Sequence, residues 1–133
     1  MVDAPDVFTR KALASLAGAE SEFAAGRYDN AANRAYYACF QAAVAALRRA
    51  GIGPSRERAG QWSHAAIQAQ FAGRLINRRK VYPSDLRDVL SNLFAQRQAA
   101  DYGDRALNDT ETARSPRQAR RFVTIVLDQG DQA

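Results

Sequence analysis

Residues 29–51 read DNAANRAYYACFQAAVAALRRAG, and this stretch decides the fold. Its larger apolar side chains recur at spacings of three and four residues, which is typical of one face of an α-helix, and small apolar residues stand beside them. They are Ala32, Tyr36, Phe40, Val44 and Leu47, with Ala35, Cys39, Ala42 and Ala46 alongside. A helix that is apolar on nearly every side is buried, so we predict that this is the central helix and that Gly51 ends it.

The same periodicity predicts helices on both sides of the central one. The first helix is expected to have its cap at Asp3 and Pro5 in its first turn, and to end at Gly26. The third is expected to begin at Ser63 or His64 and to end at the break at 82–84, and the fourth to run from Pro83 or Ser84 to about Tyr102. The fifth is expected to begin with a capping box at Ser115 and to run through Leu127. Residues 51–63 contain three glycines and a proline and are predicted to form a flexible loop. No segment shows strand alternation, so we expect an all-α, antiparallel bundle of four or five helices in one domain, residues 1–133. We expect the second and fourth helices to face each other across the core.

Several classes of protein are excluded by what the sequence lacks. Cys39 is the single cysteine and His64 the single histidine, so neither an internal disulfide nor a zinc site can form. There is no serine-nucleophile elbow and no glycine-rich phosphate loop, so we expect no metal and no cofactor. The N-terminus does not resemble a signal peptide and no apolar run could span a bilayer. We therefore expect a cytoplasmic protein without membrane contact.

The charge of the chain is concentrated in one segment. The net charge is +5, whereas residues 48–87 alone carry nine basic and two acidic residues, a local charge of +7. Such a segment favours phosphate-bearing partners, because guanidinium and ammonium groups pair with phosphate oxygens, although it also fits a solvated face. The candidate binding residues in it are Arg58, Arg74, Arg78, Arg79 and Lys80.

His64 is the one side chain with an ordinary pKa near neutrality, and Arg58 stands six residues before it. An arginine and a histidine together could bind a phosphate and move a proton. Arg58 lies in the glycine-containing loop, however, so helical geometry does not hold the two groups together. We expect His64 to be a helix cap or a surface residue, and Trp62 to pin the loop rather than stack on a base.

Arg97 interrupts the apolar face of the fourth predicted helix, which otherwise continues through Leu90 and Leu93. Asp101 follows four residues later, at the spacing of an ion pair within a helix, and the hydroxyl of Tyr102 is close in sequence. Two interpretations remain open. Arg97 either forms a salt bridge that fixes the end of the helix, or binds a phosphate or a partner protein.

Two segments resemble the HEPN family of small helical proteins. Residues 35–43, AYYACFQAA, are similar to its AYYAxFxAA helix, and residues 97–102, RQAADY, are similar to the RxxADY signature of one branch. The resemblance covers about residues 5–128. It implies a helical bundle that commonly forms a homodimer, often encoded beside a minimal nucleotidyltransferase as the toxin half of a toxin–antitoxin pair.

Many members of that family are metal-independent ribonucleases, in which an arginine is followed four to six residues later by a histidine. By this resemblance Arg97 is the arginine, but Tyr102 stands where the histidine is expected, and an unperturbed tyrosine is a poor base at neutral pH. Some relatives also carry a tyrosine that the partner enzyme adenylylates. Asp104 occupies that position, so this regulation does not carry over.

These observations lead to two functional hypotheses. The first is a dimeric, HEPN-like toxin-type or accessory protein that binds RNA or a nucleotidyltransferase partner through the basic segment, His64, Arg97 and Asp101. Ribonuclease activity is left open, with Arg97 and Tyr102 as candidate catalytic residues. The alternative is a non-catalytic interaction module that binds a nucleotidyltransferase-like antitoxin.

Overall fold

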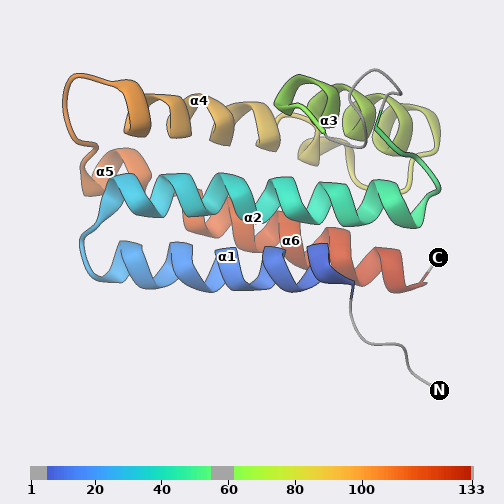
Figure 1. Cartoon of the computed structure of the whole chain (residues 1–133), viewed down its shortest axis with the longest axis horizontal. Helices are drawn as coiled ribbons and strands as arrows, with labels where there is room; N and C mark the ends of the chain where they lie inside the picture. The colour runs from blue at the N-terminus through green and yellow to red at the C-terminus, as the bar shows by residue number, and fades with distance from the viewer. Residues whose placement is uncertain (1–5, 55–61, 133) are drawn as a thin grey trace.

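Helices make up every regular element of the structure, a computed structural model that describes residues 6–54 and 62–132. In chain order they are α1 (Val7–Ala24), α2 (Tyr28–Arg49), α3 (His64–Gln70), η2 (Phe71–Arg78), η3 (Ser84–Leu86), α4 (Val89–Tyr102), α5 (Asp109–Thr112) and α6 (Ser115–Gln132) (Figure 1). The described part of the chain contains no strand, so the predicted all-α fold is confirmed. In the same part, no helix combines the length and the apolar character needed to cross a membrane.

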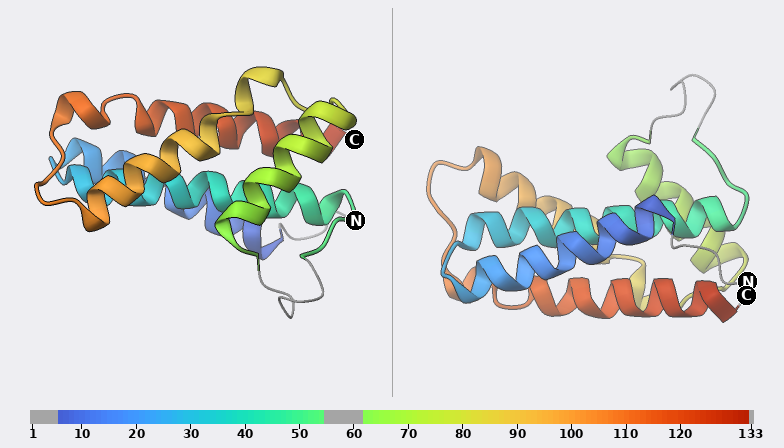
Figure 2. Two further views of the ribbon diagram at one scale, coloured as in Figure 1. Left: turned by 90° about the horizontal axis from the view of Figure 1, so that it is seen from above. Right: turned by 60° about the horizontal axis from the view of Figure 1, so that its bottom comes forward.

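Helix α2 lies at the centre of the bundle and runs antiparallel to α1 and α4 (Figures 1 and 2). It packs against α1, α4 and α6, and the shorter helices α3 and α5 also contact it. Twelve of its residues are buried, and most of them are alanines, which allow neighbouring backbones to approach closely. The predicted central helix and its contact with the fourth helix are both confirmed.

Glycines in the left-handed conformation end α1 and α2. Gly26 and Gly51 both have a φ of 79°, which a residue without a Cβ adopts readily. At the second of these turns the amide of Ile52 donates to the carbonyl of Leu47 at 2.8 Å, which closes the helix. The predicted glycine cap after the central helix is therefore present. The middle of the loop predicted at 51–63 lies outside the described residues.

The first helix begins later than predicted. Its cap is Asp6, whose carboxylate accepts a hydrogen bond from the amide of Phe8 at 2.5 Å. This bond satisfies one of the free amides of the first turn, so the helix starts at Val7. Capping at Asp3 is thus incorrect for the helix that forms, and Asp3 and Pro5 lie outside the described residues.

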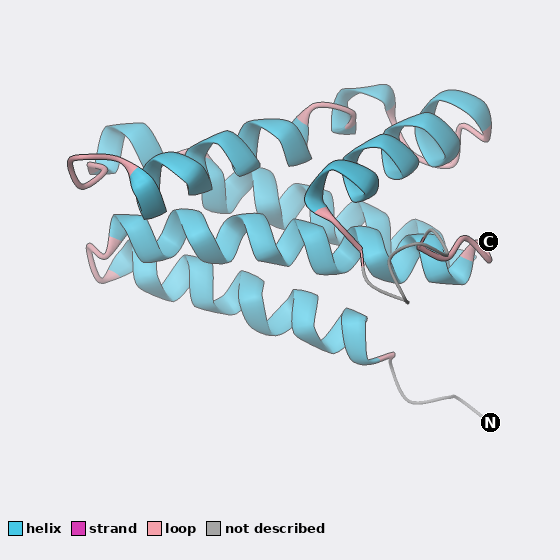
Figure 3. Cartoon of the chain, turned by 45° about the horizontal axis from the view of Figure 1, so that its top comes forward, coloured by secondary structure: helices cyan, strands magenta, loops and turns pink. Residues whose placement is uncertain are grey.

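The third helix begins as predicted but then changes its winding. Ser63 caps it by accepting a hydrogen bond from the amide of Ala66 at 3.0 Å, so α3 starts at His64. The chain continues without a break into the π-helix η2, which Figure 3 draws in line with α3. In a π-helix each amide bonds to the carbonyl five residues back, which widens the turn. The spacing of its buried residues, Phe71 and Leu75, did not predict this change.

The fourth helix is shorter than predicted. Residues 84–86 form a separate 3₁₀ turn, η3, and α4 begins only at Val89. Leu86 is buried, and Asp85 forms an ion pair with Arg121 of α6 at 2.6 Å. The turn is separate from α4, so the prediction of one continuous helix is wrong.

The connection between α4 and α6 contains a short helix that was not predicted. Asn108 and Glu111 form a capping box at the start of this helix, α5. The capping box predicted at Ser115 is wrong, because Ser115 is buried as the first residue of α6 and its hydroxyl donates to Oε1 of Gln96. The amide of the Gln96 side chain donates to the carbonyl of Glu111 at 2.7 Å. One glutamine therefore joins α4, α5 and α6.

The packing of α2 leads to a first prediction. Ala42 is fully buried, and replacing it with leucine adds three carbon atoms where neighbouring side chains already fill the space. We expect Ala42→Leu to lower the free energy of unfolding by about 1–3 kcal/mol, measured by urea denaturation. The control is Ala17→Leu at an exposed position of α1, which should change it by less than about 0.5 kcal/mol. An Ala42→Leu protein as stable as the parent would contradict close packing around α2.

Candidate functional site

Arg97 lies on α4 with only 14% of its side chain exposed. Its Nε is 3.2 Å from Oδ2 of Asp101, one helical turn further along. The carboxylate of Asp101 also accepts a hydrogen bond from Nδ2 of Asn33 on α2, at 3.2 Å. The ion pair considered from the sequence is thus present, and through Asn33 it connects α4 to the central helix.

The guanidinium of Arg97 packs on two aromatic rings of α2. Its central carbon lies 5.2 Å from the ring centroid of Tyr37 and 6.0 Å from that of Tyr36, within the range of a cation–π contact. The Nε atom is buried and donates no hydrogen bond to any described residue, even though Asp101 is near, because the N–H direction is unfavourable. Arg97 therefore keeps hydrogen-bonding capacity that its contacts in the described chain do not use.

His64 approaches the same two tyrosines from the start of α3. Its Nδ1 is 2.6 Å from the hydroxyl of Tyr36, a hydrogen bond whose direction depends on the tautomer. The imidazole also packs against Phe94 of α4 and Phe40 of α2, with ring centroids 5.0 and 5.4 Å apart. His64 is half-buried in this aromatic cluster and Ser63 is the cap, so the prediction that His64 is a cap or a surface residue is wrong.

The surroundings shift two pKa values in this cluster, and burial is the main cause of both shifts. Burial lowers the pKa of His64 below its ordinary value of 6.5, and the positive charge of Arg97 lowers it further. Burial raises the pKa of Tyr36, and only part of this effect is offset by Arg97. At neutral pH His64 is therefore uncharged and Tyr36 keeps its proton. With Nδ1 engaged by Tyr36, Nε2 is the nitrogen left to act on a ligand.

The other candidate residues lie elsewhere. Tyr102 is 74% exposed at the end of α4, whereas Arg97 on the same helix is mostly covered. Arg74 is partly buried on η2, and the exposed run 78–80 stands at the far end of the third helix from His64. Arg58 lies outside the described residues. The structure thus brings together Arg97, Asp101 and His64 from the predicted set, and the run 78–80 is separate from them.

Sequence reasoning missed the residues that join these groups. Tyr36 and Tyr37 enter the sequence analysis as part of the 35–43 motif and are not among the candidate site residues, yet the arginine and the histidine both pack on their rings. Asn33 was not considered, although it holds Asp101. The two adjacent tyrosines were a usable signal, because Tyr36 is fully buried whereas Tyr37 beside it is only partly buried and carries a polar hydroxyl.

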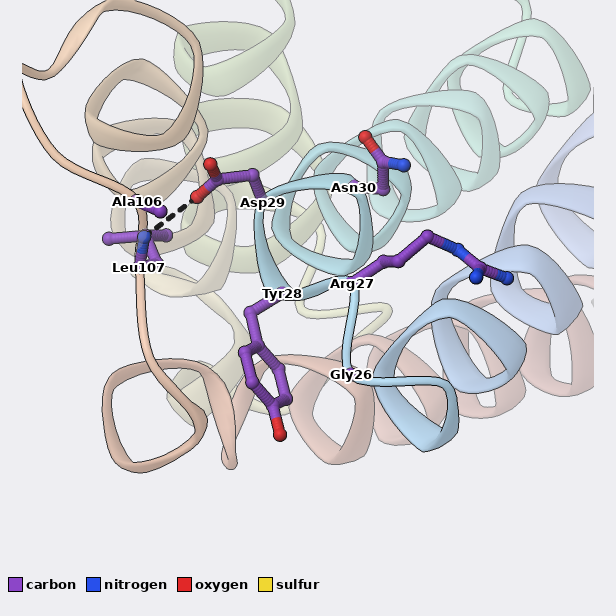
Figure 4. A pocket seen from close by; sticks show the side chains of 7 residues that line it. All are labelled: Gly26, Arg27, Tyr28, Asp29, Asn30, Ala106 and Leu107. Carbon is purple, nitrogen blue, oxygen red and sulfur yellow. Dashed lines mark hydrogen bonds between the residues drawn. The ribbon is translucent and has the colours of Figure 1, made fainter.

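A second region of interest is a hollow at the turn between α1 and α2. It has a volume of about 250 Å³ and is lined by Gly26, Arg27, Tyr28, Asp29, Asn30, Ala106 and Leu107 (Figure 4). The carboxylate of Asp29 accepts a hydrogen bond from the amide of Leu107 at 2.9 Å, so it already holds the chain that follows α4. We interpret the hollow as structural. In the described ranges, no group of three histidine, cysteine or acidic side chains is arranged to hold a metal ion.

The depressed pKa of His64 leads to a second prediction. The unfolded chain binds a proton at this histidine at higher pH than the folded protein does, so stability should fall as the pH drops below about 6.5. Glu20, Glu22 and Glu111 have lowered pKa values, so their contribution is lost only below about pH 4.5. Thermal unfolding between pH 7.5 and 5 should show a falling Tm in the parent protein and a nearly constant Tm in His64→Gln. Equal pH dependence of the two proteins would contradict the burial of the imidazole.

Comparison with known protein families identifies the chain. The HEPN domain family matches residues 6–129, which is nearly the whole sequence. No curated protein sequence matches it. The helical bundle described above agrees with the family match, and the two motifs at 35–43 and 97–102 lie on α2 and α4. The chain belongs to the HEPN family.

Proposed function

We propose that this HEPN-family protein is a toxin-type, RNA-binding protein that holds an RNA phosphate between Arg97 and His64. The observation that supports the proposal is the contact of the guanidinium and the imidazole with the same pair of rings, Tyr36 and Tyr37. An arginine with unused donors is suited to phosphate, because its planar group can give two parallel hydrogen bonds to phosphate oxygens. The aromatic rings orient the guanidinium without neutralising its charge.

Cleavage of the bound RNA is a second candidate function, and the position of His64 favours it. A neutral imidazole can accept a proton, and Tyr36 fixes the ring through Nδ1. In such a reaction Nε2 takes the proton of a ribose 2′-hydroxyl, the 2′-oxygen bonds to phosphorus, and the bond from phosphorus to the 5′-oxygen breaks. The leaving oxygen takes a proton from water, and Arg97 offsets the charge that develops on the phosphate. Tyr102 has no part in this scheme.

The proposal includes a homodimer and a nucleotidyltransferase-type partner, as the family resemblance implies, and a cytoplasmic location, as expected from the sequence. The competing role is that of a non-catalytic module that only binds this partner. The bridge from Arg97 through Asp101 to Asn33 favours that role, because it shows that the arginine also stabilises the bundle. The two roles differ in one respect: in the second, loss of Arg97 affects stability but not nucleic-acid affinity.

A third prediction separates these roles by two substitutions with opposite effects. Asp101 attracts the same guanidinium that a phosphate would bind, so Asp101→Asn should strengthen binding of a 12-nucleotide single-stranded RNA. Arg97→Gln should weaken it by about tenfold or more, because a hydrogen bond to a charged group is lost. Binding is measured by fluorescence anisotropy at several salt concentrations, since phosphate contacts make affinity salt-dependent.

The matched control for Asp101→Asn is Asp128→Asn on the exposed side of α6, which removes the same charge away from the site. The RNA affinity of Asp128→Asn should differ from that of the parent protein far less than the RNA affinity of Asp101→Asn does. If Arg97→Gln lowers Tm but leaves RNA affinity unchanged, the RNA proposal is wrong and the interaction module is favoured.

A fourth prediction concerns cleavage. Purified protein incubated with RNA in the presence of a chelator should give fragments ending in a 2′,3′-cyclic phosphate. His64→Gln should remove this activity and still bind RNA more tightly than Arg97→Gln does, because the charged guanidinium remains. Tyr102→Phe should cleave at the parental rate, because the hydroxyl of Tyr102 is not used. Intact RNA after incubation with excess parent protein would exclude the ribonuclease function. Loss of cleavage in Tyr102→Phe would transfer the role to that residue.

A further inference from the structure

A second cavity lies where the π-helix η2 ends and the chain turns into η3, two elements that contact each other. Its volume is about 290 Å³, and it is lined by Ile76, Asn77, Lys80, Tyr82, Ser84 and Arg87. None of these residues belongs to the family motifs or to the site at Arg97, and only Lys80 is among the candidate binding residues predicted from the sequence. The cavity is therefore a separate feature of the surface.

The cavity has a positive rim. Lys80 and Arg87 are exposed, and neither forms an ion pair with a residue that the structure describes. None of the described residues that line the cavity is acidic. The nearest carboxylate in sequence between the two cations, Asp85, is paired with Arg121 at 2.6 Å. Lys80 and Arg87 make the lining of the cavity positive and so favour an anion, even though Asp88 follows Arg87 directly in the chain.

The backbone at Lys80 is in an unusual conformation. Its φ is 54°, and among the described residues it is the one residue other than glycine with a positive φ. The amide of Val81 donates to the carbonyl of Leu75, six residues back, at 2.8 Å and closes the end of the π-helix around this left-handed residue; α-helices commonly have glycine at the corresponding position. A glycine would adopt this conformation without strain, so a lysine here lowers stability. What the lysine adds in return is its charged side chain at the rim of the cavity.

The floor of the cavity is rigid. The ring of Tyr82 stacks on Phe71 at a centroid distance of 5.4 Å with an angle of 17° between the planes, and its hydroxyl donates to the carbonyl of Val126 at 3.4 Å. Asn77 and Ser84 supply neutral polar groups beside the two cations. A small fixed floor with a polar, cationic rim fits a phosphate group better than it fits a large apolar ligand.

The third helix connects this cavity to the proposed RNA site. It starts at His64 and ends at Arg78, and the α-helical rise of about 1.5 Å per residue sets an upper limit of roughly 20 Å on its length, because the wider turns of η2 rise less per residue. A stacked single strand advances about 3.4 Å per nucleotide, so about six nucleotides cover this length. We propose that the cavity binds a backbone phosphate of the same RNA strand that occupies Arg97 and His64. This inference rests on the proposed function and adds the path of the strand along the third helix.

The test compares two lengths of RNA on two variants. Lys80→Gly and Arg87→Gln should each weaken binding of a 12-nucleotide RNA by roughly three- to tenfold and reduce the dependence of affinity on salt. Binding of a trinucleotide, which is too short to reach from His64 to Lys80, should be unchanged in both. Lys80→Gly should also keep or raise the Tm, because it relieves the strained backbone, so weaker binding cannot be attributed to unfolding. The control, Arg117→Gln on the exposed side of α6, should bind both RNAs like the parent.

Three other results would each contradict the proposed phosphate site at this cavity. If Arg97→Gln loses affinity for the 12-nucleotide RNA while Lys80→Gly and Arg87→Gln bind it like the parent, the cavity is not part of the RNA path and the proposed function stands. If the parent protein binds neither RNA, the proposed function and this inference are both wrong. If adenosine monophosphate binds as tightly as the longer RNA and its binding depends on Lys80, the ligand is a free nucleotide, and the inference of a strand phosphate is overturned.

Discussion

The burial of α2 on nearly all sides is the constraint on which the rest of the structure depends. A helix with buried residues around most of its circumference must be covered by several neighbours, and here α1, α4 and α6 cover it. Its many alanines let these helices approach closely. The exception is the segment with Tyr36, Tyr37 and Phe40, where large rings replace alanine. There His64 of α3 and Arg97 and Phe94 of α4 pack against the rings.

The chemistry of the candidate site follows from this local change in packing. A charged arginine and an uncharged histidine can share a small, partly dry space because aromatic faces stabilise the cation while burial disfavours a second charge. Asp101 balances Arg97 from one side, and Asn33 holds Asp101 in place. The same burial keeps Tyr36 protonated. One environment thus favours the uncharged forms of both His64 and Tyr36.

Features that depend on near neighbours in sequence were predictable, and those that depend on distant contacts were not. The central helix, the cap at Ser63 and the turn at Gly51 follow from local patterns. The break between η3 and α4 had no such local signal, and next to it Asp85 pairs with Arg121, which is far away in the sequence. For the site, the position of Arg97 on an apolar face was a correct local signal. The approach of His64, more than thirty residues before it, was not visible, and counting along one helix led to Tyr102 instead.

The π-helix η2 affects more than the winding of eight residues. Each of its hydrogen bonds encloses one residue more than a bond of an α-helix does, so the direction in which a side chain points changes along the segment. The segment therefore sets the rotation of Lys80 about the helix axis relative to His64. Deletion of one residue from η2 that restored α-helical winding would rotate Lys80 about the helix axis relative to His64. The orientation of the cavity at Lys80 relative to the site at His64 thus depends on the winding of the single helical segment that joins them.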